Sequence, residues 1–179
     1  RVNLFIADDV GLGKTIEAGM ILRELLMRQK VRRVVIACPP SVVLQWQEEL
    51  EEKLRVKFDV YRHDIDGARA FQFPMVIASL DTLKLDDPTE RLRGKSHRGV
   101  LLAAPNWDLV VFDEAHRLSA KDYGAKTEKT LNFKLAEELC GRTRDFIFLT
   151  GTPHDGTDSK FRHLLRTLEP EVVFSRGEK

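Results

Sequence analysis

Short runs of apolar residues recur along the chain, separated by longer stretches in which apolar and polar positions are mixed. The runs cover residues 2–7, 34–37, 58–61, 75–78, 109–112 and 146–149. Within each run apolar side chains occupy successive positions, so a strand formed there would be buried on both faces. The pattern predicts an α/β fold, in which a mainly parallel central sheet carries helices on both faces as a three-layer αβα sandwich.

Helical periodicity fills several intervals between these runs. Residues 14–29 carry a broad apolar stripe, and residues 131–139 and 161–168 each repeat apolar side chains at helical spacing. Residues 43–50 repeat them at i, i+3 and i+7 and follow Ser41, a candidate N-cap. We expect a helix in each of these four segments.

The segment 86–99 shows neither a continuous apolar run nor apolar residues at helical spacing. It carries four basic side chains within eight residues: Arg91, Arg93, Lys95 and Arg98. We interpret it as a surface loop. Two roles stay open, a solvated loop on the domain or a basic contact to nucleic-acid phosphates.

Composition narrows the class of protein. The chain has 179 residues, 42% hydrophobic and 32% charged, which fits one globular domain over residues 1–179 and excludes a disordered tail or a membrane span. The net charge of +1 means that any nucleic-acid contact must come from local patches. Cys38 and Cys140 lie far apart, which suggests a reducing, cytoplasmic location. The chain begins with Arg1, and we expect it to be a piece of a longer protein.

A glycine-rich turn joins the first strand to the first helix. Residues 7–15 read Ala-Asp-Asp-Val-Gly-Leu-Gly-Lys-Thr. Glycines there let backbone N–H groups approach phosphates, Lys14 supplies a positive charge, and Thr15 offers a hydroxyl to Mg²⁺. The strict phosphate-loop pattern has Gly at position 8, where this chain has Asp. The predicted nucleotide-binding residues are Asp9, Val10, Gly11, Leu12, Gly13, Lys14 and Thr15.

A second candidate site follows the buried run 109–112, where two adjacent carboxylates occur. Asp113, at the end of the strand, would hold Mg²⁺ through its water shell, and Glu114 would orient or deprotonate the attacking water. In isolation such a pair could merely cap the next helix. Lys14 and Thr15 upstream favour the catalytic interpretation, because a phosphate loop needs a metal held opposite it.

Three segments together resemble a known family. Residues 7–19, Asp-Glu-Ala-His at 113–116 (a DEAH box) and Leu-Thr-Gly-Thr-Pro at 149–153 are similar to motifs I, II and III of helicase superfamily 2. The first of them most resembles the SWI/SNF-type ATPases, in a prokaryotic branch related to the RapA/HepA ATPase. Residues 36–46 and 76–83 resemble motifs Ia and Ib.

The resemblance implies a RecA-like P-loop NTPase lobe that uses ATP and Mg²⁺, with Glu114, Asp113 and Lys14 as catalytic residues and Thr15 and Asp113 as metal ligands. It implies that His116, Thr150 and Thr152 couple the nucleotide site to the nucleic acid. It also implies that four residues lie near the DNA backbone: Pro40, Ser41, Ser79 and Thr82. Small hydroxyl groups suit contacts to phosphate oxygens, and Ser41 has an equal claim as the N-cap.

The same resemblance predicts the N-terminal lobe of a double-stranded-DNA translocase that remodels or displaces protein–DNA complexes. Its partners would be double-stranded DNA, a C-terminal RecA-like lobe of the same chain, and RNA polymerase or another DNA-bound protein, in a cytoplasmic, nucleoid-associated location and without a membrane. Arginine fingers from the second lobe contribute about 10³–10⁵ in rate, so we expect the isolated lobe to hydrolyse ATP barely at all. An unwinding helicase and a nucleotide-responsive binding module are the alternatives.

Other aromatic residues are interpreted as structural. Trp46 lies on the apolar stripe of a helix with an acidic outer face, so packing in the core is favoured over base stacking. Trp107 precedes the strand that ends at Asp113 and is expected to pack at its entrance.

Overall fold

The computed structural model describes residues 2–7, 13–62, 71–84, 96–123 and 126–151, and the side chains of residues 121–126 are outside this description. The strands are β1 (Asn3–Ala7), β2 (Val34–Cys38), β3 (Asp59–Val60), β4 (Met75–Ser79), β5 (Leu109–Phe112), β6 (Ala120–Tyr123), β7 (Lys126–Lys129) and β8 (Asp145–Thr150). The α-helices are α1 (Lys14–Met27), α2 (Val43–Leu54), α4 (Leu80–Leu83), α6 (His97–Ala103) and α7 (Leu131–Cys140). Two 3₁₀ turns complete the described elements: η1 (Pro40–Val42) and η3 (Ala115–Arg117).

Six strands form one sheet in the order β1-β8-β5-β2-β4-β3. Every neighbouring pair in it is parallel, which confirms the sheet expected from the continuous apolar runs. All six runs become strands, although β3 is reduced to Asp59–Val60. The helix expected over 161–168 lies outside the described residues.

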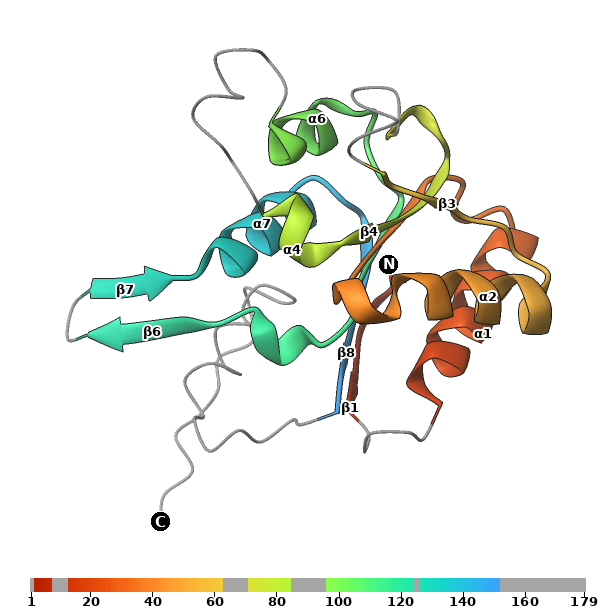
Figure 1. Ribbon diagram of the computed structural model, residues 1–179, viewed down its shortest axis with the longest axis horizontal. Coiled ribbons are helices and arrows are strands. Elements are labelled where there is room, and N and C mark those ends of the chain that lie inside the picture. The colour runs from red at the N-terminus through yellow and green to blue at the C-terminus, as the bar shows by residue number, and fades with distance from the viewer. Residues whose placement is uncertain (1, 8–12, 63–70, 85–95, 124–125, 152–179) are drawn as a thin grey trace.

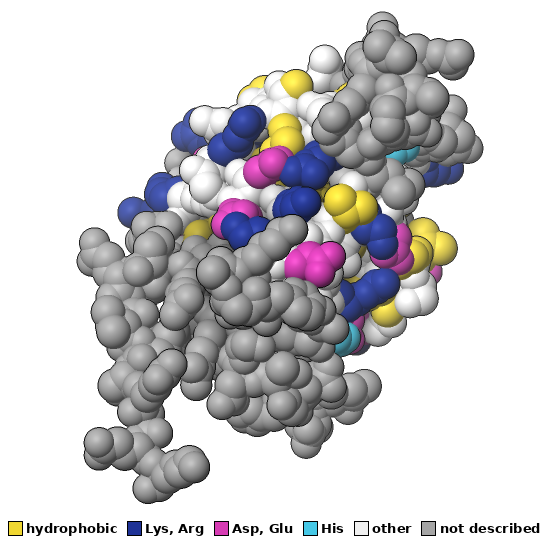
Figure 2. Space-filling view, turned by 90° about the vertical axis from the view of Figure 1, so that its left-hand side faces the viewer, with side chains coloured by type: hydrophobic (Ala, Val, Ile, Leu, Met, Phe, Trp, Pro, Cys, Tyr) yellow, Lys and Arg dark blue, Asp and Glu magenta, His cyan; other side chains and the backbone are white. Residues whose placement is uncertain are grey.

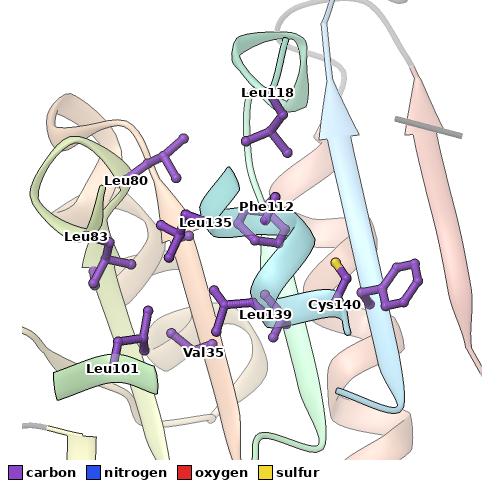
Figure 3. Packing of buried hydrophobic residues seen from close by; sticks show 14 of the residues in the cluster. Val35, Leu80, Leu83, Leu101, Phe112, Leu118, Leu135, Leu139 and Cys140 are labelled. Atoms are coloured by element: carbon purple, nitrogen blue, oxygen red, sulfur yellow. The ribbon is translucent and has the colours of Figure 1, made fainter. Parts of the chain in front are cut away.

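Alternate residues of each strand enter two separate cores, one on each face of the sheet. In β2, Val34 and Ile36 face α1 and α2, whereas Val35 and Ala37 face α4, α6 and α7. Figure 1 shows the sheet nearly edge-on between these two groups of helices. Figure 3 shows the second core, where α7 packs its leucines beside Phe112 of β5. The three-layer αβα sandwich is therefore confirmed.

Helices α1 and α2 approach each other closely on their face of the sheet. Gly19 in α1 is buried, and a Cβ atom placed on it would lie 2.3 Å from Cδ1 of Leu54 in α2. A glycine at this position lets the two helix axes come together. The contact holds α2 closely against α1.

Two segments differ from the sequence-based prediction. Residues 97–99 were expected to be loop, but they form the first turn of α6, capped by Ser96, whose Oγ accepts a hydrogen bond from the N–H of Gly99 (2.9 Å). The serine cap and the buried Leu101 stabilise this short helix against the core. The antiparallel hairpin β6–β7 was not predicted either, because its strands carry mostly polar side chains. It projects from the body of the domain (Figure 1).

The parallel sheet gathers the predicted motifs at one edge. Strands β1, β8, β5, β2 and β4 all end there, because parallel strands share a direction. The phosphate loop follows β1, Thr150 ends β8 and Asp113 follows β5. Motifs Ia and Ib follow β2 and β4. The nucleotide motifs therefore occupy one half of this edge, and the segments expected to contact DNA occupy the other.

Candidate active site

The start of helix α1 has the features of a phosphate-binding turn. Gly13 is its N-cap residue and has a φ of 87°, a left-handed conformation that glycine adopts without strain. Its carbonyl accepts hydrogen bonds from the N–H groups of Ile16 (2.8 Å) and Glu17 (3.0 Å), which starts the helical ladder directly after Lys14 and Thr15. Helix N-termini favour anions, since their first N–H groups lack partners within the helix. The other predicted loop residues, Asp9, Val10, Gly11 and Leu12, lie outside the described residues.

The carboxylate of Asp113 is held from two sides. Its Oδ2 accepts a hydrogen bond from the indole Nε1 of Trp46 (2.8 Å), and its Oδ1 accepts one from the backbone N–H of Glu114 (2.8 Å). Its own backbone N–H donates to the carbonyl of Ala37 in β2 (2.9 Å). Position and orientation of this carboxylate are thus both determined by the fold.

Glu114 turns sharply out of the strand. Its φ of 52° and ψ of 49° lie in the left-handed region, which costs a non-glycine residue about 1–2 kcal/mol. It occupies the N-cap position of η3, but its side chain makes no capping hydrogen bond, so the Glu114 carboxylate does not cap this turn. Oε2 of Glu114 instead lies 3.0 Å from Nδ1 of His116. A strained backbone kept at such a position is typical of functional sites.

His116 links Glu114 to the end of the neighbouring strand. Its Nδ1 lies 3.2 Å from Oγ1 of Thr150, the last residue of β8, whose side chain is buried. The same Nδ1 therefore faces both the carboxylate of Glu114 and the hydroxyl of Thr150. Two of the three predicted coupling residues are therefore in contact, and Thr152 lies outside the described residues.

The residues expected near DNA flank the site on the β2–β4 side. Pro40 and Ser41 are exposed in η1, and Thr82 is half-buried in α4. Ser41 is not the N-cap of α2, because Val42 occupies that position without a side-chain cap. The hydroxyl of Ser79 is buried and has no hydrogen-bond partner within the described part of the chain. A side-chain contact of Ser79 with DNA would require this hydroxyl to turn outward.

An ion-pair cluster connects the DEAH segment to motif Ib. Nη2 of Arg117 lies 3.3 Å from both carboxylate oxygens of Asp81 in α4, and Nζ of Lys84 lies 2.7 Å from Oδ1. The hydrogen bond from Lys84, with a smaller contribution from Arg117, lowers the pKa of Asp81 below its ordinary value. The cluster ties η3, which follows β5, to α4.

One thiol lies beside the site. Cys38 ends β2 and is fully buried, and burial, followed by the negative charge of Asp113, raises its pKa far above the ordinary value. A thiol in this state stays protonated and is a poor nucleophile. Cys38 therefore acts as a small apolar group against the α1–α2 core.

The basic segment around residue 98 is partly neutralised. Both guanidinium Nε and Nη2 of Arg98 contact the carboxylate of Glu138 in α7, with Nε at 3.1 Å from Oε2. On the face shown in Figure 2, basic and acidic side chains lie next to each other over the described surface. Arg98 is thus held by α7, whereas Arg91, Arg93 and Lys95 lie outside the described residues.

The residues present fit a nucleotide and a divalent metal. The N-terminus of α1 with Lys14 suits phosphate groups, and Thr15 and Asp113 supply the hard oxygen ligands that Mg²⁺ prefers. Strands β1 and β5 are separated only by β8, a spacing of about 10 Å from strand to strand. The donor chemistry and the placement at one edge therefore agree.

Sequence reasoning placed Trp46 in the core without a role at the site. It is indeed buried, but its N–H reaches Asp113. The contact could have been anticipated, because the N–H group of a buried tryptophan normally finds a hydrogen-bond acceptor. The ion pair between Asp81 and Arg117 could not be anticipated from the sequence, because exposed charged residues are common on helices. Trp107 packs at the start of β5 as expected, edge-on to Phe71.

The fold and this site define a RecA-like, helicase-type ATPase domain. The chain matches the profile of the SNF2-related domain over residues 1–178. It is 33% identical over 176 residues to the RNA polymerase-associated protein RapA of Actinobacillus pleuropneumoniae serotype 3, covering 90% of this chain and 17% of RapA. It is 33% identical over 175 residues to the uncharacterized ATP-dependent helicase YqhH of Bacillus subtilis, covering 96% of this chain and 27% of that protein.

Among solved structures, the SWI2/SNF2 ATPase core of Sulfolobus solfataricus in complex with dsDNA has the same fold. The TM-score is 0.69 at 24% identity, over 95% of this chain and 32% of that one. The chain belongs to the SNF2-related domain family, as its motifs suggested. It spans about a sixth of the length of its RapA relatives. Within its described residues, no helix is long and apolar enough to cross a membrane.

Proposed function

We propose that this chain is the ATP-binding and ATP-hydrolysing lobe of a SWI/SNF-type translocase that moves on double-stranded DNA and remodels or displaces DNA-bound proteins. The observation that carries the proposal is the meeting, at one edge of the sheet, of a phosphate-binding helix start, a doubly held carboxylate and a strained glutamate. Together the three features supply what phosphoryl transfer requires, namely a site for the phosphates, a ligand for the metal and a group that orients the attacking water.

Each residue at this edge has a separate task. Lys14 and the first turn of α1 bind the phosphates, and Thr15 and Asp113 hold the metal in place. Bound Mg²⁺ supplies neutralisation of the charge on the phosphate oxygens. Glu114 orients the attacking water and accepts its proton. The donor or acceptor character of each group and its place on the sheet support these roles.

His116 would link a change in the protonation of Glu114 to strand β8. A proton taken up by Glu114 would cancel the negative charge that attracts an N–H at Nδ1 of His116, and the ring would then shift toward Thr150. Thr150 ends β8 and leads into the segment with Thr152. This exchange would let hydrolysis alter motif III, as a coupling role requires.

The DNA track would follow the ends of β2 and β4, with Pro40, Ser41, Ser79 and Thr82 beside the phosphates. One Sulfolobus solfataricus neighbour is in complex with dsDNA, and RapA is named as RNA polymerase-associated, which supports these two partners. Such partners suit a cytoplasmic, nucleoid-associated protein. Contacts to the DNA backbone would position the strand without reading its bases.

A second RecA-like lobe belongs to this proposal. Residues 1–179 would form the first lobe, and arginine fingers of a second lobe would complete the site for rapid hydrolysis. The share of RapA that this chain spans leaves room for that lobe. By itself the present lobe would bind nucleotide weakly and hydrolyse it slowly.

The test is the ATPase rate of the full-length protein with no nucleic acid, single-stranded DNA, double-stranded DNA or RNA, at one stated salt concentration. Selective stimulation by duplex DNA is expected. Glu114→Gln should retain ATP binding and lose about 10²–10⁴ in turnover, because the amide cannot take up the proton. The control Glu48→Gln, on the exposed face of α2, should match wild type. Retained turnover in Glu114→Gln would assign the base to another residue.

An unwinding helicase is the second candidate, favoured by the name of YqhH and by the likeness to the helicase domain of Pyrococcus furiosus Hef (TM-score 0.63, 22% identity). A strand-displacement assay on the full-length protein separates the two. Release of a labelled strand at the rate of ATP turnover would support the helicase. Duplex-stimulated hydrolysis without release would support the translocase. No stimulation by any nucleic acid would favour the binding module.

A further inference from the structure

We propose that Trp46 is a positioning residue for the metal site, whose indole N–H fixes the carboxylate of Asp113 in the orientation that holds the divalent cation. The inference rests on the proposed function, because it assigns the metal to Asp113. It gives helix α2, which carries no residue of the phosphate loop or of the DEAH segment, a direct part in that site.

The contact has the geometry of a strong, fixed hydrogen bond. Nε1 of Trp46 lies 2.8 Å from Oδ2 of Asp113, across 67 positions of sequence. The acceptor is an acidic side chain, and hydrogen bonds to charged groups are about twice as strong as neutral ones. Only 1% of Trp46 is exposed, so little water competes for either group.

The two donors leave the carboxylate ready for a metal. Oδ2 is occupied by Trp46 and Oδ1 by the N–H of Glu114, each at 2.8 Å. A carboxylate oxygen accepts two hydrogen bonds, so each oxygen keeps one acceptor site. Because both donors are rigid, rotation of the carboxylate about χ2 is restricted. A ligand held in this way loses little entropy when the metal binds.

The tryptophan is itself locked in place. It shares the buried face of α2 with Leu50 and Leu54, which pack against Gly19 of α1. The N–H therefore cannot follow Asp113 if the carboxylate turns, and the restraint acts on the carboxylate. This is the arrangement by which partners of metal ligands tune a site.

Satisfying the indole N–H could by itself explain the contact, but the second tryptophan argues against this. Trp107 is also buried, at 5% exposure, and its Nε1 has no hydrogen-bond partner within the described part of the chain. Trp107 is held by packing, with Phe71 at its edge and the guanidinium of Arg33 over its ring. Among the described residues, then, burial of an indole does not by itself bring an acceptor to its N–H, and the pairing of Trp46 with Asp113 is specific to the site.

The test compares Trp46→Phe with Trp107→Phe in the full-length protein. Free Mn²⁺ is measured by electron paramagnetic resonance during titration in the presence of saturating AMP-PNP, and AMP-PNP binding is measured separately in EDTA. Trp46→Phe should weaken Mn²⁺ affinity about 10-fold or more and leave metal-free AMP-PNP binding unchanged. Trp107→Phe removes an equally large side-chain portion and should leave both affinities unchanged.

A double-mutant cycle separates positioning from general loosening of the fold. In an Asp113→Asn background, Trp46→Phe should have no further effect on Mn²⁺ affinity, whereas a loosened fold would lower it again. Wild-type Mn²⁺ affinity in Trp46→Phe, or an equal loss in Trp107→Phe, would overturn the inference. Should Trp46→Phe not fold, β-(3-benzothienyl)alanine at position 46 keeps the bicyclic shape without the N–H and gives the same readout. Wild-type protein that binds no Mn²⁺ with AMP-PNP would instead refute the proposed function.

Discussion

The imidazole Nδ1 of His116 lies 3.2 Å from the hydroxyl oxygen of Thr150, a contact between residues 34 positions apart. It joins the turn after β5 to the last residue of β8, and the same nitrogen lies 3.0 Å from Glu114. A single ring nitrogen is thus shared by the proposed catalytic base and the strand that leads into motif III. This geometry supports the proposed coupling of ATP hydrolysis to motif III.

Replacing Thr150 with valine tests that coupling. The substitution keeps the shape of the side chain and removes its hydroxyl, which abolishes the contact with His116. We expect nucleic-acid stimulation of the ATPase to fall up to about 10-fold, the equivalent of one hydrogen bond, while ATP affinity stays unchanged. Steady-state rates with and without duplex DNA measure the effect.

Thr143→Val is the matched control. Thr143 is buried and its hydroxyl donates a hydrogen bond of 2.7 Å to the carbonyl of Leu139. This variant loses a comparable hydrogen bond away from the site, so it should lower stability and leave stimulation intact. Equal losses of stimulation in the two variants would show that destabilisation, and not the contact with His116, is responsible.

Asp108 holds the opposite end of β5 from Asp113. Its Oδ2 accepts hydrogen bonds from the backbone N–H groups of Arg32 (2.7 Å) and Arg33 (2.9 Å), which brings the entrance of β2 beside that of β5. Asp108→Ala leaves both N–H groups without this acceptor and should lower the free energy of unfolding by about 1–3 kcal/mol. Urea unfolding measures the loss.

The same variant should leave nucleotide and Mn²⁺ affinities unchanged, because Asp108 lies at the edge of the sheet away from the site. Asp113→Ala should show the reverse pattern, with Mn²⁺ affinity reduced more than stability. A loss of metal affinity in Asp108→Ala would mean that the two ends of β5 are coupled.

Asp81 contributes stability that depends on pH. Its pKa is lowered, first by the hydrogen bond from Lys84, so its ion pairs stabilise the fold above the unfolded-state pKa of about 4. This contribution is lost as the pH falls through the lower pKa of the folded state. A third of the side chain is exposed, so Asp81→Asn should cost only about 0.5 kcal/mol at pH 7.

Urea unfolding at a series of pH values checks this prediction. The difference between Asp81→Asn and wild type should shrink below pH 4 and also in high salt. Arg117→Gln removes one partner and should show part of the same pH dependence. A difference that does not change with pH would show that the ion pairs make no contribution.

Several features followed from local sequence alone. Continuous apolar runs predicted the buried parallel strands, because a strand covered on both faces needs no polar side. Gly13, Lys14 and Thr15 predicted the phosphate-binding turn, because a tight turn, a charge and a hydroxyl are needed in that order. Asp113 and Glu114 were identified by their position directly after a buried strand.

The local sequence was insufficient where contacts between residues far apart in the chain determine the structure. Residues 97–99 carry charge and glycine, which suggested loop, yet the cap at Ser96 and the buried Leu101 make them helical. The contact of Arg98 with Glu138, 40 positions away, could not be predicted either, and the role of the basic segment stays open. The β6–β7 hairpin pairs polar strands without an apolar run, so the sequence pattern predicted no element there.

By itself, then, the sequence determined the elements that depend on local patterns: the strands, most helices, and the chemical types at the ends of β1 and β5. Tertiary structure alone decided the strand order, which brings β1, β8 and β5 together, and the partners of each functional group. Trp46 illustrates the difference. Its burial follows from helical periodicity, but its contact with Asp113 exists only because β2 lies beside β5 and α2 returns over them. Hydrogen bonds between residues far apart in the sequence depend on tertiary packing, so a local sequence pattern cannot predict them.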